Sequence, residues 1–135
     1  MSDEFKALIP SLLGHFLSRH AFHAVRSSVD NAGNTVDVVF ESNQCKLRFY
    51  DSKRGGEVNC LLGRIDADNE SSCTDKGSGW YYLRELLEIG KGISLEEVQK
   101  QVGPPVSGRR EQLLQLRELL EGGFEKALGK LSECP

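Results

Sequence analysis

Residues Thr35 to Gly63, TVDVVFESNQCKLRFYDSKRGGEVNCLLG, contain three short segments in which every second residue is apolar. Such alternation is typical of strands that bury one face and leave the other in contact with solvent. The sequence therefore predicts three strands that share one apolar face. The apolar positions are Val36, Val38 and Phe40, then Cys45, Leu47 and Phe49, then Val58, Cys60 and Leu62.

The turn between the first two of these strands sets their register. If Asn43-Gln44 forms a two-residue turn, the apolar faces stay together and Glu41 lies opposite Lys46 as a favourable cross-strand ion pair. A four-residue loop is the alternative, and it would instead pair Asp37 with Arg48. The next turn, residues 51–56, is longer and contains two glycines that allow positive φ.

The segments before this stretch predict a helix and an edge strand. Residues 3–19 place apolar side chains at helical spacing. Pro10 removes one backbone bond, so either the helix kinks there or Pro10 opens it. Residues 22–29 are expected to form an edge strand, and the turn-rich residues 30–34 join it to the next strand. The apolar helical positions are Phe5, Leu8, Ile9, Leu12, Leu13 and Phe16.

The segments after this stretch predict a polar loop followed by helices. Residues 64–79 are polar and acidic. Residues 80–89 are expected to be helical, with Trp80, Leu83, Leu86 and Leu87 on the buried face. A capping box at Ser94 opens a short helix. The last helix starts near Ser107, and Gly122-Gly123 weakens its middle, where a bend or a break is expected.

These elements predict one α+β domain over residues 1–135. It contains an N-terminal helix, a four-stranded antiparallel meander, and two to three C-terminal helices packed on one face of the sheet. A chain of 135 residues is close to the commonest domain size. Hydrophobic residues make up 39% and charged residues 27%, which is the composition of a globular domain.

Charge and hydropathy exclude several classes of function. The net charge is −3 and no basic stripe is present, so we expect no nucleic-acid partner. The longest apolar runs, such as residues 7–10, are too short to cross a membrane. Asp3 and Glu4 stand where a signal peptide would be basic, so we expect a cytoplasmic protein. The four cysteines, at positions 45, 60, 73 and 134, are then expected to stay reduced.

No residue pattern predicts catalysis, a metal site or a cofactor. His15, His20 and His23 have a spacing that could serve a metal only on one continuous helix, and we expect that helix to end between them. The acidic spacing of residues 66–70 lacks the glycine and glutamate of a calcium loop. Cys73 has no basic neighbour closer than Lys76, so it is a poor candidate nucleophile.

The outward face of the meander is the best candidate for function. Mixed charges surround apolar and aromatic residues there, which is the composition of a protein-binding patch. A solvated sheet face is the alternative interpretation. The outward residues that we predict to contact a partner are Asp37, Val39, Lys46, Arg48, Tyr50 and Asn59.

The layout resembles the small immunity-type proteins of bacterial polymorphic and contact-dependent toxin systems. The resemblance covers an N-terminal amphipathic helix that ends in His20-Ala-Phe22, followed by the strand Val36-Asp-Val-Val-Phe-Glu-Ser42. It continues with Leu47-Arg-Phe-Tyr-Asp-Ser52, which leads to Gly56-Glu-Val58, and with the segment Trp80-Tyr-Tyr-Leu-Arg-Glu-Leu-Leu. It is a likeness of pattern over most of the chain.

The resemblance implies a protein that binds a cognate toxin, blocks its active site and performs no catalysis. It also implies that the acidic loop, with Asp66, Asp68 and Glu70, adds to the contact surface of the outer sheet face. A secretion chaperone is an alternative, because the chain is small and acidic with a long C-terminal helix; such a protein would form a homodimer. A small enzyme or ligand-binding domain that uses Cys73 or the histidines is the other alternative.

Overall fold

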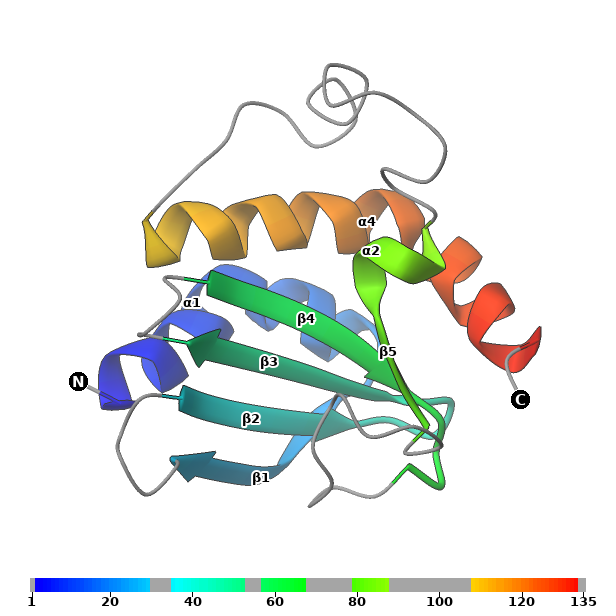
Figure 1. The fold of residues 1–135 in the computed structure, drawn as a ribbon, viewed down its shortest axis with the longest axis horizontal. Helices are drawn as coiled ribbons and strands as arrows, with labels where there is room; N and C mark the ends of the chain where they lie inside the picture. The colour runs from blue at the N-terminus through cyan, green and yellow to red at the C-terminus, as the bar shows by residue number, and fades with distance from the viewer. Residues whose placement is uncertain (1, 30–34, 53–56, 68–78, 88–107, 134–135) are drawn as a thin grey trace.

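A five-stranded antiparallel sheet and the helices that cover one of its faces make up the described structure (Figure 1). The computed structural model describes residues 2–29, 35–52, 57–67, 79–87 and 108–133. The strands, in spatial order, are β1 (His23–Val29), β2 (Thr35–Glu41), β3 (Lys46–Ser52), β4 (Glu57–Gly63) and β5 (Trp80–Tyr82). The helices are α1 (Ser2–Arg19), α2 (Leu83–Leu86) and α4 (Arg109–Glu133).

The predicted α+β class is confirmed, and the sheet has one strand more than the sequence predicts. The turns at residues 30–34 and 53–56 and the short helix that opens at Ser94 lie outside the described residues. No described helix is long and apolar enough to span a membrane.

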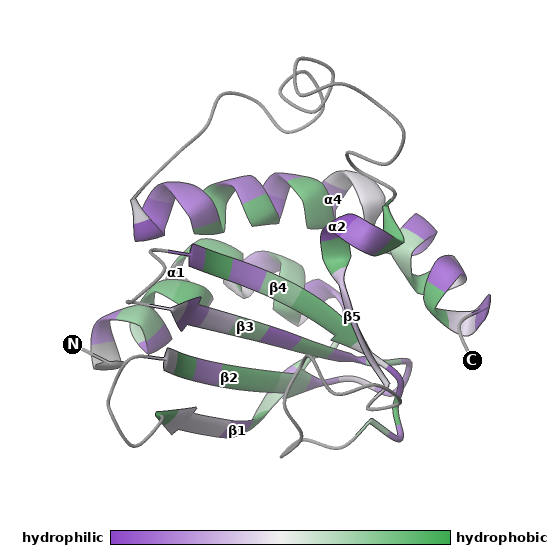
Figure 2. Cartoon of the chain, in the orientation of Figure 1, coloured by the Kyte–Doolittle hydropathy of each residue, from purple (hydrophilic) through white to green (hydrophobic). Residues whose placement is uncertain are grey.

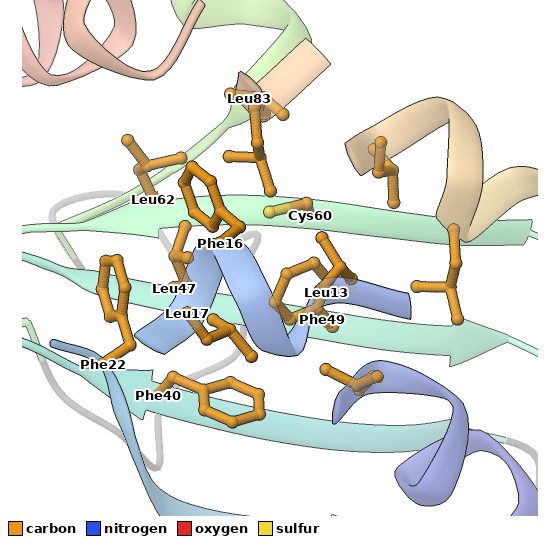
Figure 3. Packing of buried hydrophobic residues seen from close by; sticks show 14 of the residues in the cluster. Leu13, Phe16, Leu17, Phe22, Phe40, Leu47, Phe49, Cys60, Leu62 and Leu83 are labelled. Carbon is orange, nitrogen blue, oxygen red and sulfur yellow. The ribbon is translucent and has the colours of Figure 1, made fainter. Parts of the chain in front are cut away.

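The core lies between the sheet and the two long helices. All nine alternating apolar residues of β2, the 42–45 turn, β3 and β4 are buried in it. Apolar side chains of α1 lie over those of β3 and β4, and Leu83 of α2 closes one side (Figure 3). Apolar and polar residues also recur along α4, there at helical spacing (Figure 2). The buried residues of α4 are Leu113, Leu116, Leu120, Phe124, Ala127 and Leu131.

The β2–β3 hairpin adopts the register that a two-residue turn predicts. Glu41 lies opposite Lys46, and the Ser42 N–H donates to the Cys45 carbonyl at 3.0 Å. The Ser42 hydroxyl is buried and accepts from the N–H groups of Gln44 and Cys45 at 3.2 and 3.4 Å. Asp37 and Arg48, the pair of the alternative register, still meet, but as diagonal neighbours across the strands.

Both long helices continue through the residues that were expected to disturb them. α1 runs from Ser2 to Arg19 with Pro10 on its exposed side. α4 begins one residue after Gly108, whose carbonyl accepts from the Gln112 N–H at 2.9 Å. It is unbroken at Gly122-Gly123, and its last turns leave the axis of its first part (Figure 1). The expected helical interruptions are therefore bends at most.

The segment that begins at Trp80 corrects the sequence prediction of a helix over residues 80–89. Residues 80–82 form β5, which pairs with residues 61–63 of β4, and within the described part of this segment, residues 80–87, the helix comprises residues 83–86. Leu83 and Leu86 are buried in the core, as predicted. Trp80 is buried on the opposite face of the sheet. Side chains of successive strand residues point to opposite faces, so a strand separates Trp80 from the leucines where a helix would have grouped them.

Side chains protect the edge of β4 that extends beyond the short β5. The Val58 N–H donates to the side-chain oxygen Oε1 of Gln112 in α4 at 2.8 Å, and the Cys60 N–H donates to the side-chain oxygen of Asn59 at 2.9 Å. Arg109, at the start of α4, contacts the buried Asp51 carboxylate at 2.5 Å. These contacts hold α4 along the strand and satisfy backbone groups that an exposed edge would offer to another chain.

A substitution at Gly63 of β4 can test how closely Trp80 of β5 packs against it. A Cβ atom at this position would lie 2.7 Å from the Trp80 ring, whereas a Cβ atom at Gly122 in α4 would meet nothing within 4 Å. We therefore expect Gly63→Ala to lower the free energy of unfolding by roughly 1–3 kcal/mol through overpacking. Gly122→Ala is the matched control and should raise it by up to about 1 kcal/mol. Urea unfolding of both variants checks this, and equal effects would contradict the close approach.

Candidate protein-binding face

The outer face of the sheet, opposite the two long helices, is divided into a covered half and an open half. Toward the β2–β3 turn, Trp80 and Ala67 lie against Val39 and Leu61 and form a second, smaller apolar cluster. Toward the other end of the same strands, Tyr50 and Tyr82 pack against the rim of that cluster and remain half-buried. The sequence predicts an open outer face, either a protein-binding patch or a solvated surface, and the structure corrects this where Val39, Lys46, Arg48 and Leu61 are buried.

Ala67 and Trp80, which we call the covering segment, lie over two basic side chains. The Lys46 ammonium donates to the Ala67 carbonyl at 2.6 Å, and it lies 4.0 Å from the Glu41 carboxylate that the register predicts as its partner. The Arg48 guanidinium lies 5.3 Å from the centre of the Trp80 ring, which is within the range of a cation–π interaction. Both side chains lie with their stems against the sheet and are buried.

Arg48 also forms a buried ion pair with Asp37. Its Nε donates to the Asp37 carboxylate at 2.7 Å, and a second guanidinium nitrogen donates to the same oxygen. The side chains of the pair are only 9% and 15% exposed. A charge in such a position is costly without its partner, so the pair fixes the geometry of strands β2 and β3 below the covering segment.

The open half carries a connected set of polar and aromatic side chains. The Tyr50 hydroxyl donates to the Glu57 carboxylate at 2.9 Å, and the Asn59 amide donates to the other oxygen of that carboxylate at 3.3 Å. Tyr50 also forms a hydrogen bond with Tyr82. Glu57 is exposed, while the other three residues are half-buried. The network holds two aromatic rings and a carboxylate in fixed positions at the surface.

The Tyr50 hydroxyl remains a neutral donor over the whole physiological pH range. Burial is the main reason that its pKa is raised above the usual value, and the hydrogen bonds with Tyr82 and Glu57 raise the pKa further. A tyrosine in this state presents a flat apolar ring with a polar tip, which suits a protein interface.

The structure separates the predicted contact residues into three groups. Asp37, Tyr50 and Asn59 lie side by side on adjacent strands of the open half. Val39, Lys46 and Arg48 are buried, so they support the face from below and do not form its surface. Asp66 is exposed in the turn after β4, and Asp68 and Glu70 lie outside the described residues.

Tyr82 is a candidate contact residue that the sequence prediction misses. A helix over residues 80–89 would place it at a rim, whereas as a residue of β5 it lies opposite Leu61 and beside Tyr50. The run Trp80-Tyr81-Tyr82 carries the signal, because consecutive aromatic residues favour strands over helices.

The described cysteines and histidines have ordinary structural surroundings. Cys45 and Cys60 are buried in the core. Burial raises the pKa of the Cys45 thiol to about 11, although a hydrogen bond with Ser42 opposes the shift, and burial followed by the proximity of Cys45 raises the pKa of Cys60. His20 packs between the rings of Phe16 and Phe124, with centroid distances of 4.6 and 4.7 Å. Within the described ranges, no group of three potential ligands could hold a metal ion.

Comparison with known proteins gives no match: no family model, no curated protein and no solved structure is significantly similar to this chain.

The buried ion pair gives a test of the support below the face. We expect Arg48→Met to lower the free energy of unfolding by roughly 3 kcal/mol, because it leaves the Asp37 charge buried without its partner. Arg48→Met combined with Asp37→Asn should cost less than the sum of the single changes. Arg110→Met, at an exposed position of α4, is the control and should change stability by no more than about 0.5 kcal/mol. An Arg48→Met variant as stable as this control would contradict the ion pair's role.

The buried thiols give a test that depends on pH. The test uses a Cys73→Ser/Cys134→Ser background. In native protein at pH 8, less than about a tenth of a thiol per chain should react with a disulfide reagent, and in unfolded protein both remaining thiols should react. The two thiols should add no pH dependence to stability well below about pH 8.5, the pKa of an unfolded thiol, and the difference in stability from a Cys45→Ala/Cys60→Ala variant isolates their contribution. That contribution should fall as the pH rises from there toward 11, because the unfolded chain loses thiol protons that the native chain keeps. Rapid labelling of native protein would contradict the buried positions.

Proposed function

We propose that this chain is a non-catalytic protein-binding domain that contacts its partner through the open half of the outer sheet face. The observation that carries the proposal is the fixed pair of half-buried tyrosines, Tyr50 and Tyr82, next to the exposed Glu57 carboxylate. Tyrosine is enriched among the residues that dominate binding energy at interfaces. A ring that is already held by neighbours loses little conformational entropy on binding, so it contributes more to affinity.

The electrostatics of this face favour a partner with a basic patch. Arg48 forms an ion pair with Asp37, whereas the exposed Glu57 carboxylate accepts hydrogen bonds from the neutral groups of Tyr50 and Asn59. The charge of Glu57 opposes the lowering of the Arg84 pKa that burial causes, so Arg84 offsets part of the negative charge that Glu57 presents at the edge of the face. A lysine or arginine of the partner would complement it and accelerate association.

We further propose that the partner is a toxin domain that the chain neutralises, as in the immunity-type proteins that its sequence resembles. The resemblance supports the kind of partner, and the open face supports the mode of contact. The buried, high-pKa thiols of Cys45 and Cys60 are poor nucleophiles, which agrees with a binding role and favours the proposal over an enzyme built on either residue.

The proposal predicts that a gene adjacent to the gene of this chain encodes a toxin domain, and the test uses that domain; a gene without such a neighbour would count against the immunity role. Coexpression should restore the growth of cells that produce the toxin domain, and the purified proteins should bind each other. Tyr50→Ala and Tyr82→Ala should each raise Kd by about 30-fold or more, the effect expected of interface hot spots. Glu57→Lys should slow association, because it reverses a charge at the edge of the face and removes the acceptor of the Tyr50 and Asn59 hydrogen bonds, and it should leave the sheet and the core intact, because Glu57 is exposed.

Matched controls separate binding from folding. Glu118→Lys makes the same change of charge at an exposed position of α4, on the other side of the molecule, and should leave binding unchanged. Arg48→Glu is unsuitable, because it would bury two carboxylates side by side and unfold the chain. Undiminished binding by all three face variants would exclude this face. Failure to protect cells from the neighbouring toxin domain would exclude the immunity role.

A further inference from the structure

A pocket of about 540 Å³ lies where the C-terminal end of α4 faces the β2–β3 turn and the turn that follows β4. It is at the opposite end of the strands from Tyr50 and Glu57, so it is separate from the proposed protein-binding face. A second hollow of about 390 Å³ adjoins it and shares Gln44, Leu128 and Ser132 with it. The volume of the first pocket is within the size range of small-molecule sites even without the second hollow.

Part of the pocket wall is apolar. Leu128 and Leu131 of α4 line one side, and Ile65 of the turn lines the other. Ile65 is 48% exposed, an unusual degree for a large aliphatic residue that faces a hollow. An apolar group placed between these side chains would remove Ile65 from water and gain the free energy of its burial.

Two opposite charges stand on either side of Ile65. Arg64 is half-buried and Asp66 is exposed, and both line the pocket. Among the residues that the structure describes, neither side chain has a hydrogen bond or an ion pair, not even with the other. The Arg64 guanidinium lines the pocket without a partner among the described residues, so it is placed to bind the carboxylate of a ligand.

The backbone that carries these charges is held in place. The Arg64 N–H donates to the Gly79 carbonyl at 3.2 Å, and the Arg64 carbonyl accepts from the Ala67 N–H at 2.9 Å. Gly79 has φ of +88°, and Ala67 packs against it, so the base of the turn has little freedom. A turn fixed in this way can present Arg64 and Asp66 with the spacing that a ligand requires.

We propose that this pocket binds a zwitterion with an apolar side chain: an apolar α-amino acid, or a short peptide of such residues. The Arg64 guanidinium would bind the carboxylate through two parallel hydrogen bonds, and the Asp66 carboxylate would accept from the ammonium group. The apolar side chain would lie between Ile65 and the leucines of α4. A ligand with an anion alone fits less well, because Asp66 stands beside Arg64, and Glu125 lies with His20 in the adjoining hollow.

The experiment is a titration followed by two-dimensional NMR of the ¹⁵N-labelled full chain. L-phenylalanine, L-leucine and the dipeptide Leu-Leu should shift the backbone amides of residues 44, 64–67 and 128–132. Phenethylamine lacks the carboxylate, 3-phenylpropionate lacks the ammonium, and glycine lacks the apolar side chain. Each should bind at least about tenfold more weakly than phenylalanine, because each leaves one part of the pocket without its partner. Tighter binding of Leu-Leu than of leucine would identify a peptide, and the reverse would identify a free amino acid.

Variants assign the effect to the two charges. Arg64→Gln and Asp66→Asn should each weaken phenylalanine binding at least about tenfold, while Arg110→Gln, at an exposed position of α4 that does not line the pocket, should not change it. Both charged positions lie at the surface of a turn, so amide shifts elsewhere in the chain will report an intact fold. The proposal is overturned if phenylalanine and Leu-Leu cause no saturable shift at these residues. It is equally overturned if phenethylamine or 3-phenylpropionate binds as well as phenylalanine does.

Discussion

The β2–β3 turn is the constraint on which the rest of the sheet depends. The buried Ser42 hydroxyl accepts from two backbone N–H groups of the turn and donates to the Cys45 carbonyl at 3.3 Å. These bonds hold the loop at two residues and so fix the pairing of every residue from Glu41 to Thr35 with its partner in β3. A slip by one residue would send the whole apolar set to the other face, so this turn decides which face receives α1 and α4.

The same register determines how the outer face is divided. It places Val39, Arg48 and Leu61 in one row across the strands, with Tyr82 as the last member. The apolar members of that row and the guanidinium together form a surface that Trp80 can cover, because an arginine offers a flat cation to an aromatic ring. Asp37, in the next row, then neutralises Arg48 from the open side. One ion pair thus lies at the boundary between the covered and the open half.

The sequence predicts the inner face well and the outer face poorly, for a physical reason. Residues such as Phe40 and Leu47 alternate with polar ones, and a period of two has only one structural interpretation at that length. Lys46 and Arg48 look solvated in the same pattern, because a sequence does not reveal which segment far along the chain will cover a long side chain. The presence of Val39 and Leu61 at outward positions is the signal that such a cover exists. The sequence pattern predicts Trp80 in a helix, because a three-residue strand is too short to show its own period.

Substitutions in the covered half and in the open half of the outer face have different consequences. Residues of the covered half, such as Arg48, are held by both the sheet and the segment above it, so a change there alters the fold first. Tyr50 and Tyr82 touch the same apolar cluster only at its rim, and a change there leaves the cluster largely intact. Because the two tyrosines are half-buried at the rim and rest on a rigid support, substitutions there would change the surface while the register below it stays constant. A fixed scaffold with an adjustable rim suits the binding role that we propose.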